Sequence, residues 1–238
     1  MTKARKPCWT RCWGGAAVIL AGHCLASPSL AFEAGAERAL EIMRPDYRNY
    51  VGDIRPLTGK ARGAASVLYM ALVRPGASDP SRRENAPFLG PGALNDILYD
   101  PMLFETGASA SWVRLLLDHE YFHARHLAGA TCLPVPPPAP APMEKHFFEA
   151  AAWGFNVAQA RSGRYPGLSE TEFREALDRY GEHYRALRTL TREDGGADAW
   201  ESLSSRLRDP DSLLTTTGAA APAAPAHLSG PGRSPAIP

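Results

Sequence analysis

Two histidines lie four residues apart, with a glutamate beside the first of them, in a segment near the middle of the chain. Residues 117–126 read LDHEYFHARH, so His119, Glu120 and His123 form the pattern His-Glu-x-x-His. On a helix, residues four apart lie about 5 to 6 Å apart at Cβ on one face. Both imidazoles can therefore reach one metal ion at about 2.0 to 2.1 Å, the usual zinc–nitrogen distance. Glu120 would lie beside the metal and could accept a proton from a metal-bound water.

The surrounding residues predict one long helix with the histidines on its inner face. Ser109 or Ser111 can cap its start, and the helix is expected to run to about Ala128 with Gly129 as its stop. One stripe at helical spacing is apolar apart from its histidines, and the opposite stripe is polar. The first consists of Trp112, Leu115, His119, His123 and His126, and the second of Arg114, Asp118, Tyr121 and Arg125.

Glu120 lies on a stripe that flanks the inner face, together with Val113, Leu117, Ala124 and Leu127. It is the only charged residue of that stripe, and a buried carboxylate is costly without a partner. A metal-bound water is a suitable partner. His126 shares the inner face but lies about 4.5 Å further along the axis than His123. We expect His126 to be either a residue of the pocket around the metal or a histidine at the solvent edge.

The segment resembles the metal-binding helix of zincin metallopeptidases. The elongated metzincin pattern would need a third histidine at position 129, which is Gly129. The gluzincin pattern instead takes its third ligand from a glutamate on the next helix. Two residues compete for that role, Glu144 and Glu149. Glu149 is preferred because the small residues 150–152 that follow it resemble the gluzincin pattern, whereas Glu144 lies in a first turn, where the helix dipole alone favours a carboxylate.

The resemblance implies a compact zincin-like domain that uses Zn²⁺ to cleave peptide or protein substrates, with Glu120 as general base. In such a domain an edge strand beside the metal, here within residues 64–73, would pair with an extended substrate. The residue that would stabilise the oxyanion is one of Tyr165, Tyr180 and His183. Tyr180 also falls in an apolar stripe of its own predicted helix, so packing in the core is an alternative for it.

Two other functions are compatible with parts of this pattern. A non-catalytic binding or scaffold protein of the cell envelope could keep the same fold, although a purely structural zinc site has no need of Glu120. A carboxylate-bridged di-iron bundle would require a second Glu-x-x-His on another helix. The glutamates of the later segments are not followed by histidine at that spacing.

The rest of the central region predicts two strands and three more helices. Residues 64–73 and 97–99 have the composition of strands, the first being ended by Arg74-Pro75-Gly76. Helices are expected over 36–43, from 143 to 161, and from Ser169 onward, where Glu172 completes a capping box and Leu168 can staple against Phe173. The order indicates an α+β fold, in which a small sheet or hairpin packs on the metal-binding helix pair and a further C-terminal helix completes the domain.

The two ends are expected to lie outside this domain. Residues 1–31 combine Lys and Arg residues, an uncharged run from Trp13 to Leu25, and small residues before Phe32, which together predict a signal peptide and a secreted or periplasmic protein. A retained anchor, or lipidation at Cys24, is the alternative. Residues 209–238 are rich in Ala, Pro, Gly and Thr and are predicted to be disordered. The folded domain is therefore expected over 32–208.

Charge and cysteine content restrict the possible partners. The formal net charge is +1 and no Lys/Arg cluster is interleaved with aromatic residues, so a nucleic-acid partner is not expected. The apolar run near the N-terminus is shorter than the roughly 20 residues of a membrane span, so no stable span is expected after signal cleavage. Three of the four cysteines precede residue 25, and Cys132 alone would remain, which leaves no intrachain disulfide.

Overall fold

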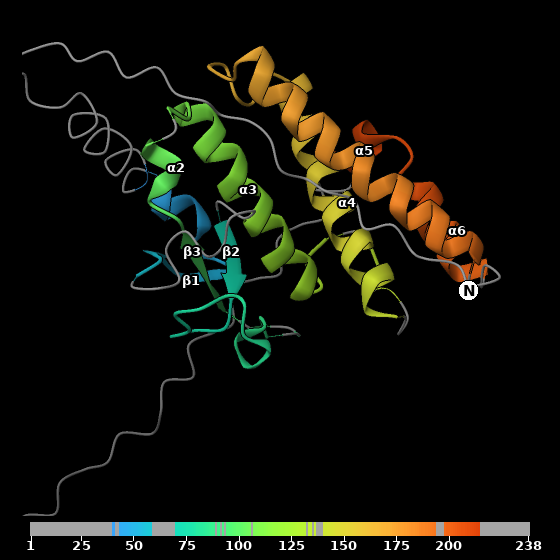
Figure 1. Ribbon diagram of the computed structural model, residues 1–238, viewed down its shortest axis with the longest axis horizontal. Helices are drawn as coiled ribbons and strands as arrows, with labels where there is room; N and C mark the ends of the chain where they lie inside the picture. The colour runs from blue at the N-terminus through green and yellow to red at the C-terminus, as the bar shows by residue number, and fades with distance from the viewer. Residues whose placement is uncertain are drawn as a thin grey trace, which may run out of the picture.

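The computed structural model describes residues 40, 43–58, 70–88, 90, 92, 94–105, 107–131, 133, 134, 136, 140–193 and 198–214. Within them the fold is α+β, as predicted, with a small sheet on one side and a layer of helices on the other (Figure 1). None of the helices in this part of the chain has the length and apolar character that a membrane crossing requires. The predicted signal peptide and Cys132 lie outside the described residues.

The sheet has three strands in the order β1-β3-β2. β1 (Val51–Pro56) pairs in parallel with β3 (Asn95–Tyr99), and β2 (Met70–Val73) pairs antiparallel with the other side of β3. β3 is the central strand and is buried along its whole length. β2 is an edge strand among the described residues, and it contacts helix α3.

Four helices form the second layer. α3 (Ala110–Leu127) lies against the sheet, α4 (Ala141–Arg161) packs on α3, and α5 (Glu170–Glu193) packs on the opposite side of α4 (Figure 1). α6 (Asp198–Arg206) then packs on α5. The helix expected over 143–161 is thus confirmed and begins two residues earlier. Shorter elements complete the fold: η1 (Arg44–Tyr47), η3 (Arg83–Asn85), α2 (Met102–Glu105) and η4 (Pro210–Leu213).

A single glutamate caps two helices. The Ser169 Oγ accepts a hydrogen bond from the Glu172 backbone N–H, and the Glu172 carboxylate accepts one from the Ser169 N–H, which confirms the predicted capping box. The same carboxylate also accepts hydrogen bonds from the backbone N–H and the Oγ of Ser109, the N-cap of α3. Glu172 therefore ties the start of α5 to the start of the helix that carries the histidines.

Two hydrophobic clusters account for most of the core. One lies between the sheet, η1 and α3, and the other joins α4, α5, α6 and η4. In the second, Leu213 of η4 is buried, and η4 contacts α4, so the described fold includes residues beyond the expected boundary at residue 208. Gly154 permits this contact, because a Cβ at that position would lie 2.9 Å from Leu213 Cδ1 and 3.2 Å from the Tyr180 ring.

The two strand predictions are met in part. β3 includes the expected residues 97–99 and starts two residues earlier, whereas of the expected strand 64–73 the structure describes only Met70–Val73 as β2. β1 was not predicted. Its sequence VGDIRP contains Gly, Asp, Arg and Pro, and its burial is irregular, so its extended form depends on pairing with β3. Of the helix expected over 36–43, only Leu40 and Met43 are described, and both are helical.

Candidate metal centre

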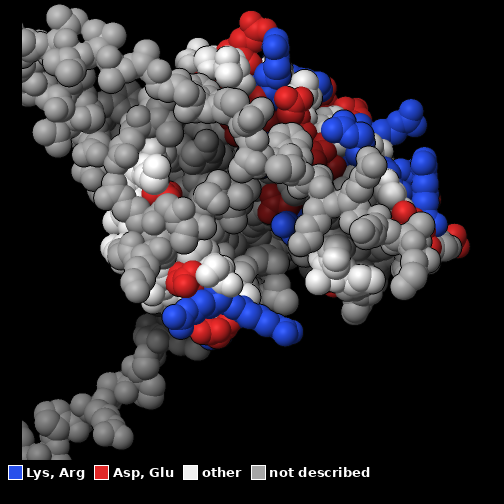
Figure 2. Space-filling view, viewed as in Figure 1, with Lys and Arg blue, Asp and Glu red and all other residues white. Residues whose placement is uncertain are grey.

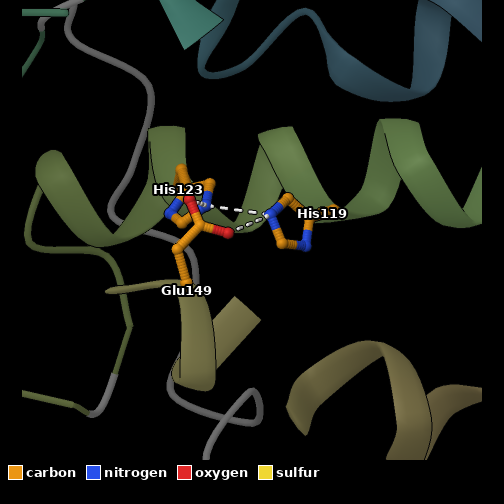
Figure 3. Close-up of side chains that lie close together, drawn as sticks. All are labelled: His119, His123 and Glu149. Carbon is orange, nitrogen blue, oxygen red and sulfur yellow. Dashed lines mark hydrogen bonds and ion pairs between the residues drawn. The ribbon is translucent and has the colours of Figure 1, made fainter. Parts of the chain in front are cut away.

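Three side chains from two helices meet at the interface of α3 and α4. His119 and His123 lie one turn apart on α3, and Glu149 faces them from α4 (Figure 3). His119 Nε2 is 3.1 Å from His123 Nε2 and 3.4 Å from Glu149 Oε2, while His123 Nε2 is 3.9 Å from Glu149 Oε1. These three residues can hold a metal ion, as the sequence predicts for the two histidines.

The ligand atoms of the three residues lie close enough together to bind one metal ion. Metal–ligand bonds of 2.0 to 2.1 Å at the tetrahedral angle place ligand atoms about 3.3 Å apart. The distances from His119 Nε2 to His123 Nε2 and to Glu149 Oε2 lie close to this value, whereas the 3.9 Å distance from His123 Nε2 is to the other carboxylate oxygen, Oε1. One ligand atom from each of the three residues lies within 4.8 Å of the other two. Of the two glutamates that competed for the third position, Glu149 belongs to the group and Glu144 does not.

Burial and charge prepare the group for a cation. Burial lowers the pKa of His123 to about 3, so its imidazole is neutral and keeps a lone pair near neutral pH. Burial alone would raise the pKa of Glu149, but the hydrogen bond with His119 and the electrostatic attraction of the neighbouring histidines outweigh it and lower that pKa. Neutral imidazoles and an ionised carboxylate are the forms that bind metals.

Small residues allow α3 and α4 to approach closely. Ala150, Ala151 and Ala152, which follow Glu149, are fully buried. The next residue, Trp153, places its ring centroid 4.4 Å from that of His119 and fixes one side of the imidazole. His119 Nδ1 is buried without a hydrogen-bond partner in the described structure, so the ring is held by packing and by the contacts of Nε2.

Glu120 lies beside the group and contacts the edge of the sheet. Its side chain is buried, and its Oε2 accepts a hydrogen bond of 2.9 Å from the backbone N–H of Leu72 in β2. Burial raises the Glu120 pKa to about 7, the nearby Glu149 raising it further while His119 and the Leu72 N–H oppose the shift. The buried carboxylate therefore has a protein partner, which the sequence did not predict.

Asp118 has a different environment from the one expected. It was placed on a polar outer stripe of the helix, but it is only 7% exposed. Its carboxylate accepts hydrogen bonds from the hydroxyls of Tyr47 (2.8 Å) and Tyr165 (2.9 Å). Burial raises the pKa of Asp118, although both tyrosines and two arginines oppose the shift. At Asp118 the polar stripe of α3 is covered by η1 and by the connection between α4 and α5. The two hydrogen bonds of Asp118 link both segments to α3.

His126 is not part of the metal group. It is completely buried, and its Nε2 lies 3.4 Å from the Pro134 carbonyl oxygen. The rings of Phe122, Phe147 and Phe148 surround it. It is therefore a packed core residue. The expectation of a histidine at the solvent edge is wrong.

The candidates for oxyanion stabilisation differ in their availability. The hydroxyl of Tyr165 is bound to Asp118, and that of Tyr180 donates to the Leu207 carbonyl, so each is already used in the core. His183 is half-buried on α5, with its Nδ1 2.9 Å from His146 Nδ1. Burial lowers the His183 pKa while the charge of Glu149 raises it, which places His183 within electrostatic range of the metal group.

Comparison of the chain with protein-family models, with curated proteins and with solved structures gives no match.

Proposed function

We propose that the protein is a zinc-dependent hydrolase, an exported metallo-endopeptidase in which Glu120 is the general base. The proposal rests above all on one observation: two imidazoles and a carboxylate converge at metal-binding distances, with a second, buried carboxylate next to them. Two histidines and a glutamate are the protein ligands of several catalytic zinc sites, in which the fourth position stays open. A zinc ion held there would activate a water molecule and polarise a substrate carbonyl.

The environment of Glu120 suits the role of a base. A general base works best when its pKa lies near the working pH, and burial brings that of Glu120 to about 7. The hydrogen bond from Leu72 orients the carboxylate and leaves its other oxygen, Oε1, free to accept a proton. After accepting the proton, Glu120 can deliver it to the leaving amine.

The position of β2 supports a peptide substrate. β2 is an edge strand among the described residues and pairs with β3 on one side only. Its Leu72 N–H points away from β3 toward Glu120, so a substrate strand laid along this edge would pass the metal group. Of the three candidates for stabilising the oxyanion, His183 is preferred because the hydroxyls of Tyr165 and Tyr180 are engaged in the core, while His183 uses only its Nδ1 in a contact with His146.

Replacement of Glu120 separates catalysis from metal binding. We expect the zinc-loaded full chain to cleave members of a diverse peptide library, as detected by mass spectrometry. Glu120→Gln should keep zinc and lose about 100-fold or more of the cleavage rate, since the base is removed. Glu144→Gln, the matched control, should keep both zinc and cleavage. Stoichiometric zinc in the unaltered chain without cleavage of any peptide would contradict the proposal.

One observation favours the alternative, a binding or scaffold protein of the envelope. The contact between Glu120 and the Leu72 N–H satisfies a buried carboxylate without any catalysis. If this contact is the purpose of Glu120, the protein will bind zinc but show no hydrolysis of peptides, esters or amides.

A further inference from the structure

A cationic groove lies between α5 and α6, separate from the metal group. It is open to solvent on one side and has a volume of about 620 Å³. Arg185, Arg188 and Arg192 line it from α5, Glu201 and Ser205 from α6, and Arg208 from the segment after α6. Figure 2 shows Lys and Arg side chains, interspersed with Asp and Glu, along the side of the molecule where α5 runs. We call this feature the α5–α6 groove.

The charges of this groove are unbalanced. Arg185, Arg188 and Arg192 are spaced by three and four residues, so their side chains lie on one face of α5, where like charges repel. Glu201 is the only acidic side chain lining the groove among the described residues, and it pairs with Arg188. Four guanidinium groups thus face one carboxylate, and an anion would relieve the repulsion.

Two observations describe how Arg188 and Arg185 are placed. Arg188 also donates a hydrogen bond of 2.9 Å to the Ser204 Oγ, so α5 and α6 are joined at the floor of the groove. Arg185 folds back onto its own helix: a Cβ at Gly181 would lie 3.0 Å from Arg185 Nη1. Glycine is unfavourable inside a helix, but at position 181 it leaves room for this guanidinium.

We propose that the α5–α6 groove binds a phosphate-bearing ligand. A guanidinium presents paired N–H donors that match phosphate oxygens, and several converging arginines suit a group with more than one negative charge. Arg185, Arg192 and Arg208 are exposed and contribute the donors, while Arg188 and Glu201 fix the distance between the helices. The hydroxyl of Ser205 supplies a further donor at the same wall.

Calorimetric titration of the full chain with inorganic pyrophosphate tests this site. The titration is done after the metal has been removed, because pyrophosphate would also bind zinc. We expect saturable binding that is weakened about tenfold or more in Arg185→Gln/Arg192→Gln, since two charge-assisted contacts are lost. The control Arg174→Gln/Arg179→Gln removes the same charge from α5 outside the groove and should weaken binding less than about threefold. Circular dichroism verifies that both variants are folded.

Vesicles identify the source of the phosphate. If free pyrophosphate does not bind, but vesicles of phosphatidylglycerol bind the unaltered chain and not Arg185→Gln/Arg192→Gln, the ligand is a lipid headgroup and the site stands. Equal weakening in both double variants would show that net charge alone attracts the anion and would overturn the proposal. Absence of binding to both pyrophosphate and vesicles would also overturn it.

Discussion

Replacing Glu120 by glutamine is expected to change how the stability of the metal-free protein depends on pH. Burial raises the pKa of this carboxyl from its ordinary value of 4.5 to about 7 in the folded chain. Each unit by which the pKa of a group differs between the folded and unfolded states corresponds to about 1.4 kcal/mol. The free energy of unfolding is therefore about 3 kcal/mol larger when Glu120 is protonated than when it is charged.

The direction follows from the raised pKa. The stabilisation by protonated Glu120 is fully present below pH 4.5, declines as the pH rises, and is absent above about pH 7. Glutamine does not titrate, and its oxygen can still accept the Leu72 N–H. The free energy of unfolding of Glu120→Gln minus that of the unaltered chain should thus increase by about 3 kcal/mol between pH 4.5 and pH 8.

Urea denaturation in the presence of a chelator measures this difference. Burial lowers the pKa of His123 to about 3, which destabilises the fold in acid, but it does so in both proteins and cancels. Glu170→Gln, at a side chain 83% exposed, is the matched control and should follow the unaltered chain at every pH. If the difference for Glu120→Gln stays constant within about 0.5 kcal/mol across the range, the assigned environment of Glu120 is wrong.

Two further predictions concern the supports of the metal-binding helix. Asp118→Ala leaves the buried hydroxyls of Tyr47 and Tyr165 without their acceptor. We therefore expect the free energy of unfolding, measured by urea denaturation at pH 7, to fall by about 2 to 5 kcal/mol. A decrease below about 1 kcal/mol would contradict the assignment. Glu172→Ala removes caps from both α3 and α5 and should cost about 1 to 2 kcal/mol, whereas Glu175→Ala on the same helix should cost less than about 0.5 kcal/mol. Equal losses in these two variants would show that the double cap does not stabilise the fold.

Features encoded by neighbouring residues could be predicted from the sequence. The ends of α3 were predicted at Ser109 or Ser111 and at Gly129. Of the two serines, Ser109 accepts the N-cap hydrogen bond, and Gly129 adopts a positive φ of 71°. The histidine pair follows from helical spacing alone. Glu149 could be preferred only through the zincin resemblance, because the contact between α4 and α3 is not encoded in either helix by itself.

Features that depend on distant contacts could not be predicted. The capping box of Glu172 was visible in the sequence, but its hydrogen bonds to Ser109 join residues 63 positions apart. Asp118 looked like a solvent-facing residue because the tyrosines that bury it come from η1 and from the chain after α4. The Leu72–Glu120 hydrogen bond likewise requires the sheet to be placed against α3.

Metal analysis of purified full-length protein tests the central assignment most directly. The unaltered chain and Glu144→Ala should each retain about one zinc ion per chain after dialysis, because His119, His123 and Glu149 are intact in both. Glu149→Ala should lose the zinc while remaining folded by circular dichroism. Zinc retained in Glu149→Ala but lost in Glu144→Ala would contradict the ligand set, and the absence of a bound metal from the unaltered chain after zinc loading would contradict the metal centre itself.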